Sequence, residues 1–181
     1  INVGASPFGI AYDPSNGYLY VTNLFSGTVS VINPSNNTVI ATITVGRFPE
    51  GIAYDPSNGY IYVANSGSGT VSVINPSNNS VVATISVGGG PVCIAYDPSN
   101  GYLYVTDGDS NSVSVINPLN NSVIATISVG EYPFGIAYDS SNGYLYVANR
   151  GSNSVSVINP STNSVVTTIT VGRFPEGIAY D

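Results

Sequence analysis

The chain has 181 residues, of which only 7% are charged: three Arg, no Lys and no His stand against ten carboxylates, for a formal net charge of −7 at pH 7. Nucleic acid is not expected as a partner, because phosphate contacts need Lys and Arg. Without His and Lys, the familiar serine or cysteine triads, imidazole metal ligands and Schiff-base chemistry are also not expected, so the composition argues against an enzyme.

A 42-residue unit repeats along the whole chain. The segment that begins at Gly9 returns, with few changes, at Gly51, Cys93 and Gly135 and, cut short, at Gly177. A constant period of this size is typical of repeat proteins, in which each copy buries its apolar faces only by stacking on its neighbours. We expect one repeat array over residues 1–181, with complete copies at 9–45, 51–87, 93–129 and 135–171 and the start of a fifth at 172–181.

Each copy is predicted to contain four strands. In the first copy they lie at residues 9–13, 18–23, 28–33 and 38–45. Turn residues join the first strand to the second and the third to the fourth, at Pro14–Gly17 and Pro34–Asn37. Both tight turns therefore lie on one side of the copy, which we call the turn side. The other two connections, residues 24–27 and 46–50 and their counterparts, form the loop side.

The first two strands of each copy are apolar on both faces. Ile10 and Tyr12 share one face and Ala11 lies on the other, so these strands should be covered on both sides, whereas the third and fourth strands contain more Ser and Thr. A four-stranded sheet of this kind is typical of a propeller blade. The predicted fold class is all-β: a β-propeller of four-stranded antiparallel blades, four complete and a fifth partial. Such a chain is either an arc of a larger ring or is completed by other copies.

The second strand ends in the same four-residue motif in every copy. The four versions are Tyr20-Val21-Thr22-Asn23, Tyr62-Val63-Ala64-Asn65, Tyr104-Val105-Thr106-Asp107 and Tyr146-Val147-Ala148-Asn149. The motif resembles the Tyr-Val-Thr-Asn signature of YVTN-type β-propellers, found in archaeal and bacterial cell-surface proteins. This resemblance implies a propeller, commonly of seven blades, and a location at the cell surface. It implies no common catalytic residue.

The loop side is the predicted binding face, because its sequence differs between copies whereas the turn side barely changes. All five Phe fall in these segments. Exposed aromatic rings grouped on the loops of a rigid scaffold can form a ligand or partner surface, although the same rings could instead fill gaps between blades. The residues assigned to this face are Phe8, Phe25, Arg47, Phe48, Glu50, Tyr132, Phe134, Arg150, Arg173 and Phe174.

Two further motifs suggest sites. Three copies carry an N-glycosylation sequon in the second turn, with acceptors Asn36, Asn78 and Asn120, although turn chemistry by itself also favours Asn and Ser there. Oxygen ligands also occur at alternate positions in Asp107, Asp109 and Asn111, as at the start of a calcium loop. The later Gly and Glu of such a loop are missing, so calcium is only a secondary reading, and no cofactor is expected.

Together these patterns predict a non-catalytic extracellular or cell-surface module with a structural, assembly or binding role. The expected partners are other protein chains or surface glycans. Self-association through the fourth strand is also expected, since uncharged sheet edges invite pairing. No apolar run is long enough to span a bilayer. The alternative is a hydrolase or lactonase-like enzyme on the same scaffold.

If the sequons are used, the native protein should be heavier than its polypeptide. We expect its intact mass to exceed that of its polypeptide by increments that contain hexose, because the second turn is an accessible place for sugar. Mass spectrometry of native material decides the point. A mass equal to that of the bare chain would contradict the prediction.

Overall fold

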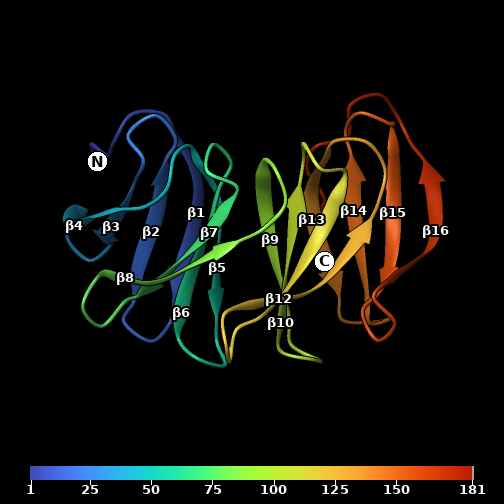
Figure 1. Cartoon of the computed structure of the whole chain (residues 1–181). Helices are drawn as coiled ribbons and strands as arrows, with labels where there is room; N and C mark the ends of the chain where they lie inside the picture. The colour runs from blue at the N-terminus through green and yellow to red at the C-terminus, as the bar shows by residue number, and fades with distance from the viewer. Residues whose placement is uncertain (181) are drawn as a thin grey trace. The chain divides into compact units, whose positions relative to one another are not determined.

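A computed structural model describes residues 1–180, which form four antiparallel sheets of four strands each (Figure 1). In the first sheet the strands are β1 (Pro7–Asp13), β2 (Tyr18–Asn23), β3 (Thr28–Asn33) and β4 (Thr38–Thr44), and they pair in that order. Residues 1–180 contain no helix, and hence none long and apolar enough to cross a membrane. The all-β fold with four-stranded propeller blades is confirmed.

The other three blades repeat this arrangement. The second blade contains β5 (Pro49–Asp55), β6 (Tyr60–Asn65), β7 (Thr70–Asn75) and β8 (Ser80–Ser86). The third contains β9 (Pro91–Asp97), β10 (Tyr102–Asp107), β11 (Ser112–Asn117) and β12 (Ser122–Ser128). The fourth contains β13 (Pro133–Asp139), β14 (Tyr144–Asn149), β15 (Ser154–Asn159) and β16 (Ser164–Thr170).

The turn between the first two strands is fixed by the Asp that ends the first strand. Asp13 Oδ1 accepts hydrogen bonds from the Ser15 amide at 2.9 Å and the Ser15 hydroxyl at 2.6 Å. The Gly17 amide donates to the Asp13 carbonyl at 2.8 Å, with a backbone φ of 76° that suits glycine. The same bonds recur at the corresponding Asp of the other blades, Asp55, Asp97 and Asp139. The invariant Asp is therefore explained by folding.

The chain divides into two compact units, Ile1–Ser86 and Val87–Asp181, each of which holds two blades. Within each unit the blades pack through their apolar faces. In the first unit, Tyr20, Val29, Val31 and Ile43 of the first blade meet Ile61, Val63 and Ile74 of the second. In the second unit, Tyr104, Val113, Val115 and Ile127 of the third blade meet Ile136, Leu145, Val147 and Ile158 of the fourth.

Burial along each blade differs from the expectation. In the first blade the second and third strands are the most buried, while the first and fourth strands are both mostly exposed. The expectation of a wetter third strand was wrong because its serines are paired. Asn23 Nδ2 donates to Thr28 Oγ1 at 3.1 Å and to the buried Ser30 Oγ at 3.0 Å. A buried hydroxyl with a hydrogen-bond partner is tolerated inside a core.

The expected start of a fifth blade forms no strand within residues 172–180. A Cβ placed on Gly135 would nevertheless clash with the Glu176 carbonyl, just as one on Gly9 would lie 2.5 Å from the Glu50 carbonyl. The segment around Glu176 thus runs beside β13 as β5 runs beside β1. Asp181, the expected end of this strand, lies outside the described residues.

The contribution of blade packing to stability can be tested with two isoleucines that occupy the same position in different blades. Ile43 is 5% exposed beneath the second blade, whereas Ile169, its counterpart in the fourth blade, is 46% exposed. We expect Ile43→Ala to lower the free energy of unfolding by about 2–4 kcal/mol, because it leaves a cavity in the core. Ile169→Ala should cost less than about 1 kcal/mol. Denaturant unfolding of both variants measures this; equal losses would show that blade packing does not dominate.

Candidate functional site

The loop side of the first unit contains a hollow of about 250 Å³. Two connections build it, the β2–β3 loop and the β4–β5 loop. Its lining residues are Leu24, Phe25, Ser26, Gly27, Arg47 and Phe48. The β2–β3 loop is held by its own backbone, since the Gly27 amide donates to the Asn23 carbonyl at 3.0 Å and the Gly27 carbonyl accepts from the Val45 amide at 3.0 Å. These two bonds fix the backbone of the β2–β3 loop at the edge of the hollow.

Two aromatic rings and a guanidinium dominate this hollow. The rings of Phe25 and Phe48 meet edge to face, with centroids 6.2 Å apart and planes at 80°. The Arg47 Cζ lies 5.7 Å from the centroid of the Phe48 ring, within the range of a cation–π contact. Phe25 is 72% exposed and Phe48 is 40% exposed. The site thus offers apolar ring surface beside a positive charge.

In three copies the residue directly before the Pro of the connection that follows the fourth strand is aromatic. There it adopts a backbone conformation that bulky side chains rarely take. Phe48, Tyr132 and Phe174 have φ of 51°, 48° and 56°, in the left-handed region. Glycine suits the position better, and the third blade has Gly90 there, with φ of 62°. The Phe48 ring also needs space over Gly67, whose Cβ would lie 2.5 Å from Phe48 Cδ2. Strained and exposed aromatic residues of this kind suggest a function in recognition.

The second unit has a related cluster around Arg150. The Arg150 Cζ lies 5.9 Å from the centroid of Tyr132 and 5.5 Å from that of Phe174. Arg150 Nε also donates to Glu176 Oε1 at 2.8 Å, in an ion pair whose side chains are 42% and 53% exposed. Such a solvent-exposed pair adds little stability. Glu176 was missed in the sequence, although its Arg-Phe-Pro-Glu run repeats residues 47–50 and could have indicated it.

The other residues assigned to the binding face are more scattered. Phe8 and Phe134 lie in β1 and β13 rather than in loops; Phe8 is exposed and Phe134 is half-buried. Glu50 is half-buried in β5, and Arg173 is exposed beside Phe174. Within the described residues, the structure therefore brings together two groups: Phe25, Arg47 and Phe48 in one unit, and Tyr132, Arg150, Phe174 and Glu176 in the other.

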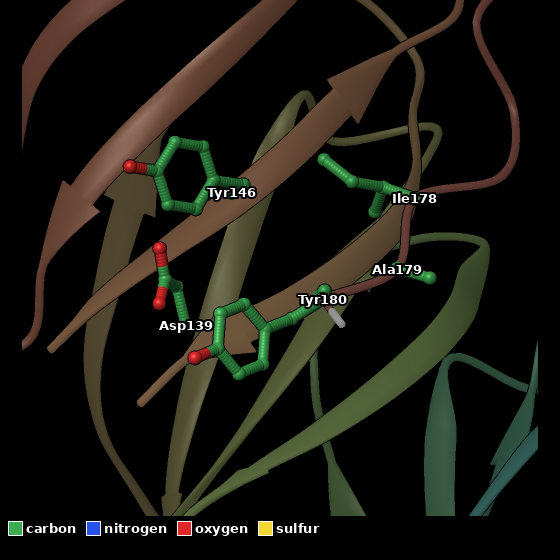
Figure 2. A pocket seen from close by; sticks show the side chains of 6 residues that line it. Asp139, Tyr146, Ile178, Ala179 and Tyr180 are labelled. Carbon is green, nitrogen blue, oxygen red and sulfur yellow. The ribbon is translucent and has the colours of Figure 1, made fainter. Parts of the chain in front are cut away.

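A second hollow, of about 220 Å³, lies against the fourth blade. It is lined by Ala137, Asp139, Tyr146, Ile178, Ala179 and Tyr180, and Figure 2 shows the Asp139 carboxylate between the rings of Tyr146 and Tyr180. The counterpart of Tyr146 in the first blade is Tyr20, which is fully buried in the cluster with Ile61 and Val63 of the second blade. This hollow therefore has the character of a blade-packing surface rather than of a ligand site.

The three calcium candidates are not brought together. Asp107 is fully buried and accepts hydrogen bonds from Ser114 Oγ at 2.7 Å and Ser112 Oγ at 3.3 Å, whereas Asp109 is exposed. Asn111 Oδ1 accepts instead from the Tyr132 amide at 2.8 Å. Among residues 1–180, no group of three or more His, Cys, Asp or Glu is placed to hold a metal ion.

The three sequon asparagines are exposed in the turns between the third and fourth strands. The Oδ1 atoms of Asn36, Asn78 and Asn120 each accept a hydrogen bond from the hydroxyl two residues later at 2.7 Å. These turns lie on the turn side, at the opposite end of each blade from the loop side.

Comparison with known proteins gives the family. A model described as a repeat of unknown function (DUF6923) matches residues 4–179. The chain belongs to this repeat family. No curated protein matches it.

Solved structures similar to this DUF6923 chain are β-propeller proteins. Hydrazine synthase of Kuenenia stuttgartiensis is 24% identical, with a TM-score of 0.85 over 94% of this chain and 51% of that one. Virginiamycin B lyase from Staphylococcus aureus is 17% identical, with a TM-score of 0.84 over 98% and 61%. A putative 6-phosphogluconolactonase from Bacteroides uniformis is 19% identical, with a TM-score of 0.78 over 93% and 56%.

These similarities concern the fold alone, since each identity is low. The chain spans between 51% and 61% of the length of these three proteins.

Asp107 is the one carboxylate at the last position of the second strand, where the other three copies have Asn. Burial raises the pKa of its carboxyl from 3.8 to about 6, although hydrogen bonds from Ser114 and Ser112 lower it in part. The Asn149 carboxamide instead donates to Ser154 Oγ at 3.1 Å and to Ser156 Oγ at 2.9 Å, and carries no charge. The third blade therefore contains a buried carboxyl that is harder to ionise than an exposed one.

Asp107→Asn is expected to stabilise the protein at neutral pH. A folded-state pKa above that of the unfolded chain stabilises the fold below pH 3.8, and this contribution is lost as pH rises through about 6. We therefore expect the variant to gain on the order of 2–3 kcal/mol at pH 7.5 and almost nothing at pH 3.5. Denaturant unfolding at pH values from 3.5 to 7.5 measures this gain in the free energy of unfolding. The control is Asp109→Asn, because Asp109 is exposed. A gain that does not depend on pH would contradict the prediction.

Proposed function

We propose that this chain is a non-catalytic binding module of an extracellular, YVTN-type cell-surface propeller, and that its loop side contacts the partner. The observation that carries the proposal is a set of exposed aromatic residues held at positive φ, each adjacent to or stacked with an arginine: Phe48, Tyr132 and Phe174. Glycine would adopt this backbone with less strain. Contact of these three rings with a partner would offset the strain of their backbone conformation.

The distribution of charge supports this proposal. All three cationic side chains of the chain, Arg47, Arg150 and Arg173, lie in loop-side segments, although the net charge is −7. Arginine and the aromatic residues Tyr, Trp and Phe are enriched at the cores of protein interfaces. Protein chains and surface glycans are both partners that such a surface suits.

Other features fit a location outside the cell. Glycans on Asn36, Asn78 and Asn120 would extend from the turn side and leave the loop side open.

The edge strand β4 carries no charge and is mostly exposed, which suits lateral self-association. The enzyme names among the structural neighbours keep a hydrolase or lactonase-like activity as the alternative, at the level of the fold only.

A triple glycine variant tests the loop side directly. Phe48→Gly, Tyr132→Gly and Phe174→Gly together should leave the fold intact, because glycine favours the observed φ, but should lower adsorption to cell envelopes of the producing organism at least tenfold. Cosedimentation measures adsorption and circular dichroism checks the fold.

The matched control is a second triple variant, Asn37→Gly, Asn79→Gly and Asn121→Gly. These turn-side residues have φ of 57°, 54° and 54°, so the backbone change is the same but the loop side is untouched. The control should adsorb like the wild type. If both triple variants adsorb normally, or if both fail, the loop side is not the binding face.

A further inference from the structure

We propose that the hollow lined by Phe25, Arg47 and Phe48 binds one uronic-acid residue of an acidic glycan. The apolar face of the sugar ring lies on Phe25, and its carboxylate pairs with the Arg47 guanidinium. This inference rests on the proposed binding function of the loop side and names the chemical class of its ligand.

The shape of the hollow suits a single ring. At about 250 Å³ it is below the roughly 300–1,000 Å³ of pockets for drug-sized ligands. Phe25 and Phe48 stand at 80° to each other and so form a corner. Phe25 is 72% exposed, so much of its ring surface is accessible. A pyranose has a flat apolar face of C–H groups that can cover an aromatic ring.

The charge of the hollow favours an acid over a neutral sugar. Arg47 is one of three cations in a chain with ten carboxylates, so an anionic ligand is repelled by most of the surface and attracted here. A guanidinium presents two parallel N–H donors to a carboxylate, which gives orientation as well as affinity. The stacking of Arg47 near the Phe48 ring, at 5.7 Å, helps to hold that donor in place.

The backbone around the hollow argues against a peptide ligand. The Leu24 amide donates to the Ser6 carbonyl at 2.9 Å, and the Phe25 amide donates to the Ala5 carbonyl at 3.2 Å. The Ser26 hydroxyl accepts from the Ala5 amide at 2.8 Å. These groups are already engaged, so an extended peptide cannot add itself through main-chain hydrogen bonds. The ligand must therefore be recognised by side chains, which suits the rigid ring of a sugar.

The chain contains a natural control for this site. Residues 171–176 repeat the sequence of residues 45–50, Val-Gly-Arg-Phe-Pro-Glu, but the facing loop has Gly151 where the first blade has Phe25. The adjacent Arg150 is already paired with Glu176 at 2.8 Å. Arg173 therefore sits in the same loop sequence without the aromatic wall that would stack the sugar.

Titration of the ¹⁵N-labelled 181-residue chain with methyl β-D-glucuronide tests the inference, with methyl β-D-glucoside as the neutral probe. We expect amide shifts confined to residues 24–27 and 46–50 and a Kd on the order of 1 mM, as is usual for so small a ligand. The neutral glucoside should bind at least tenfold more weakly. Phe25→Ser and Arg47→Gln should each weaken glucuronide binding at least tenfold, whereas Arg173→Gln should change it less than twofold.

Several results would overturn this inference. They are equal binding of the two glycosides, equal effects of Arg47→Gln and Arg173→Gln, or no shifts at all up to 50-fold above about 1 mM. The wild-type pattern of amide peaks elsewhere in each variant shows that the fold survives. Adsorption of the triple glycine variants tests the loop-side function separately, so failure of the glycan inference can be told apart from failure of the proposed function.

Discussion

The packing of one sheet face on another is the interaction on which this structure depends. Each blade is apolar on both broad faces, and burial of a Val or Ile side chain between blades stabilises the fold by about 1.5–3 kcal/mol. Tyr20 and Ile61 are fully buried because they lie in one cluster shared by two blades. Ile10 and Ile169, on faces that no sheet of their own unit covers, are 61% and 46% exposed. The repeat is therefore a unit of packing, and one copy alone could not form a core.

The recurring motif is a packing device rather than a functional signature. Thr22 Oγ1 donates to the Glu50 carbonyl at 2.7 Å and so joins the first blade to the second, and Asn23 satisfies the buried Ser30. Thr106 makes the corresponding bond to the Phe134 carbonyl at 2.7 Å. Once these bonds fix the strands, the loops that they carry are free to vary. This division explains why the family resemblance identifies the fold but leaves the ligand to the loop side.

The sequence predicted the strands well and the site in part. Turn chemistry set both bounds of β2 and β3, whereas β1 begins at Pro7, two residues before the predicted start, because loop and strand residues look alike there. Burial of Ser30 could not be predicted, since its partner Asn23 is recognisable only once the two strands are paired. Variation between copies indicated Phe25 and Phe48, but a bulky residue at positive φ has no sequence signature. The pair of Arg150 and Glu176 joins residues far apart in the chain and appears only in the fold.

Mutual dependence of neighbouring blades is tested most directly by native-state hydrogen exchange in the first unit. Separation of its two blades exposes both halves of the cluster that contains Tyr20 and Ile61. The amides of β2, β3, β6 and β7 should therefore exchange through one shared opening, with the same free energy and the same dependence on denaturant. Exchange of β2 and β3 at a much lower free energy, with β6 and β7 still protected, would show that a blade stands without its neighbour and would contradict the account.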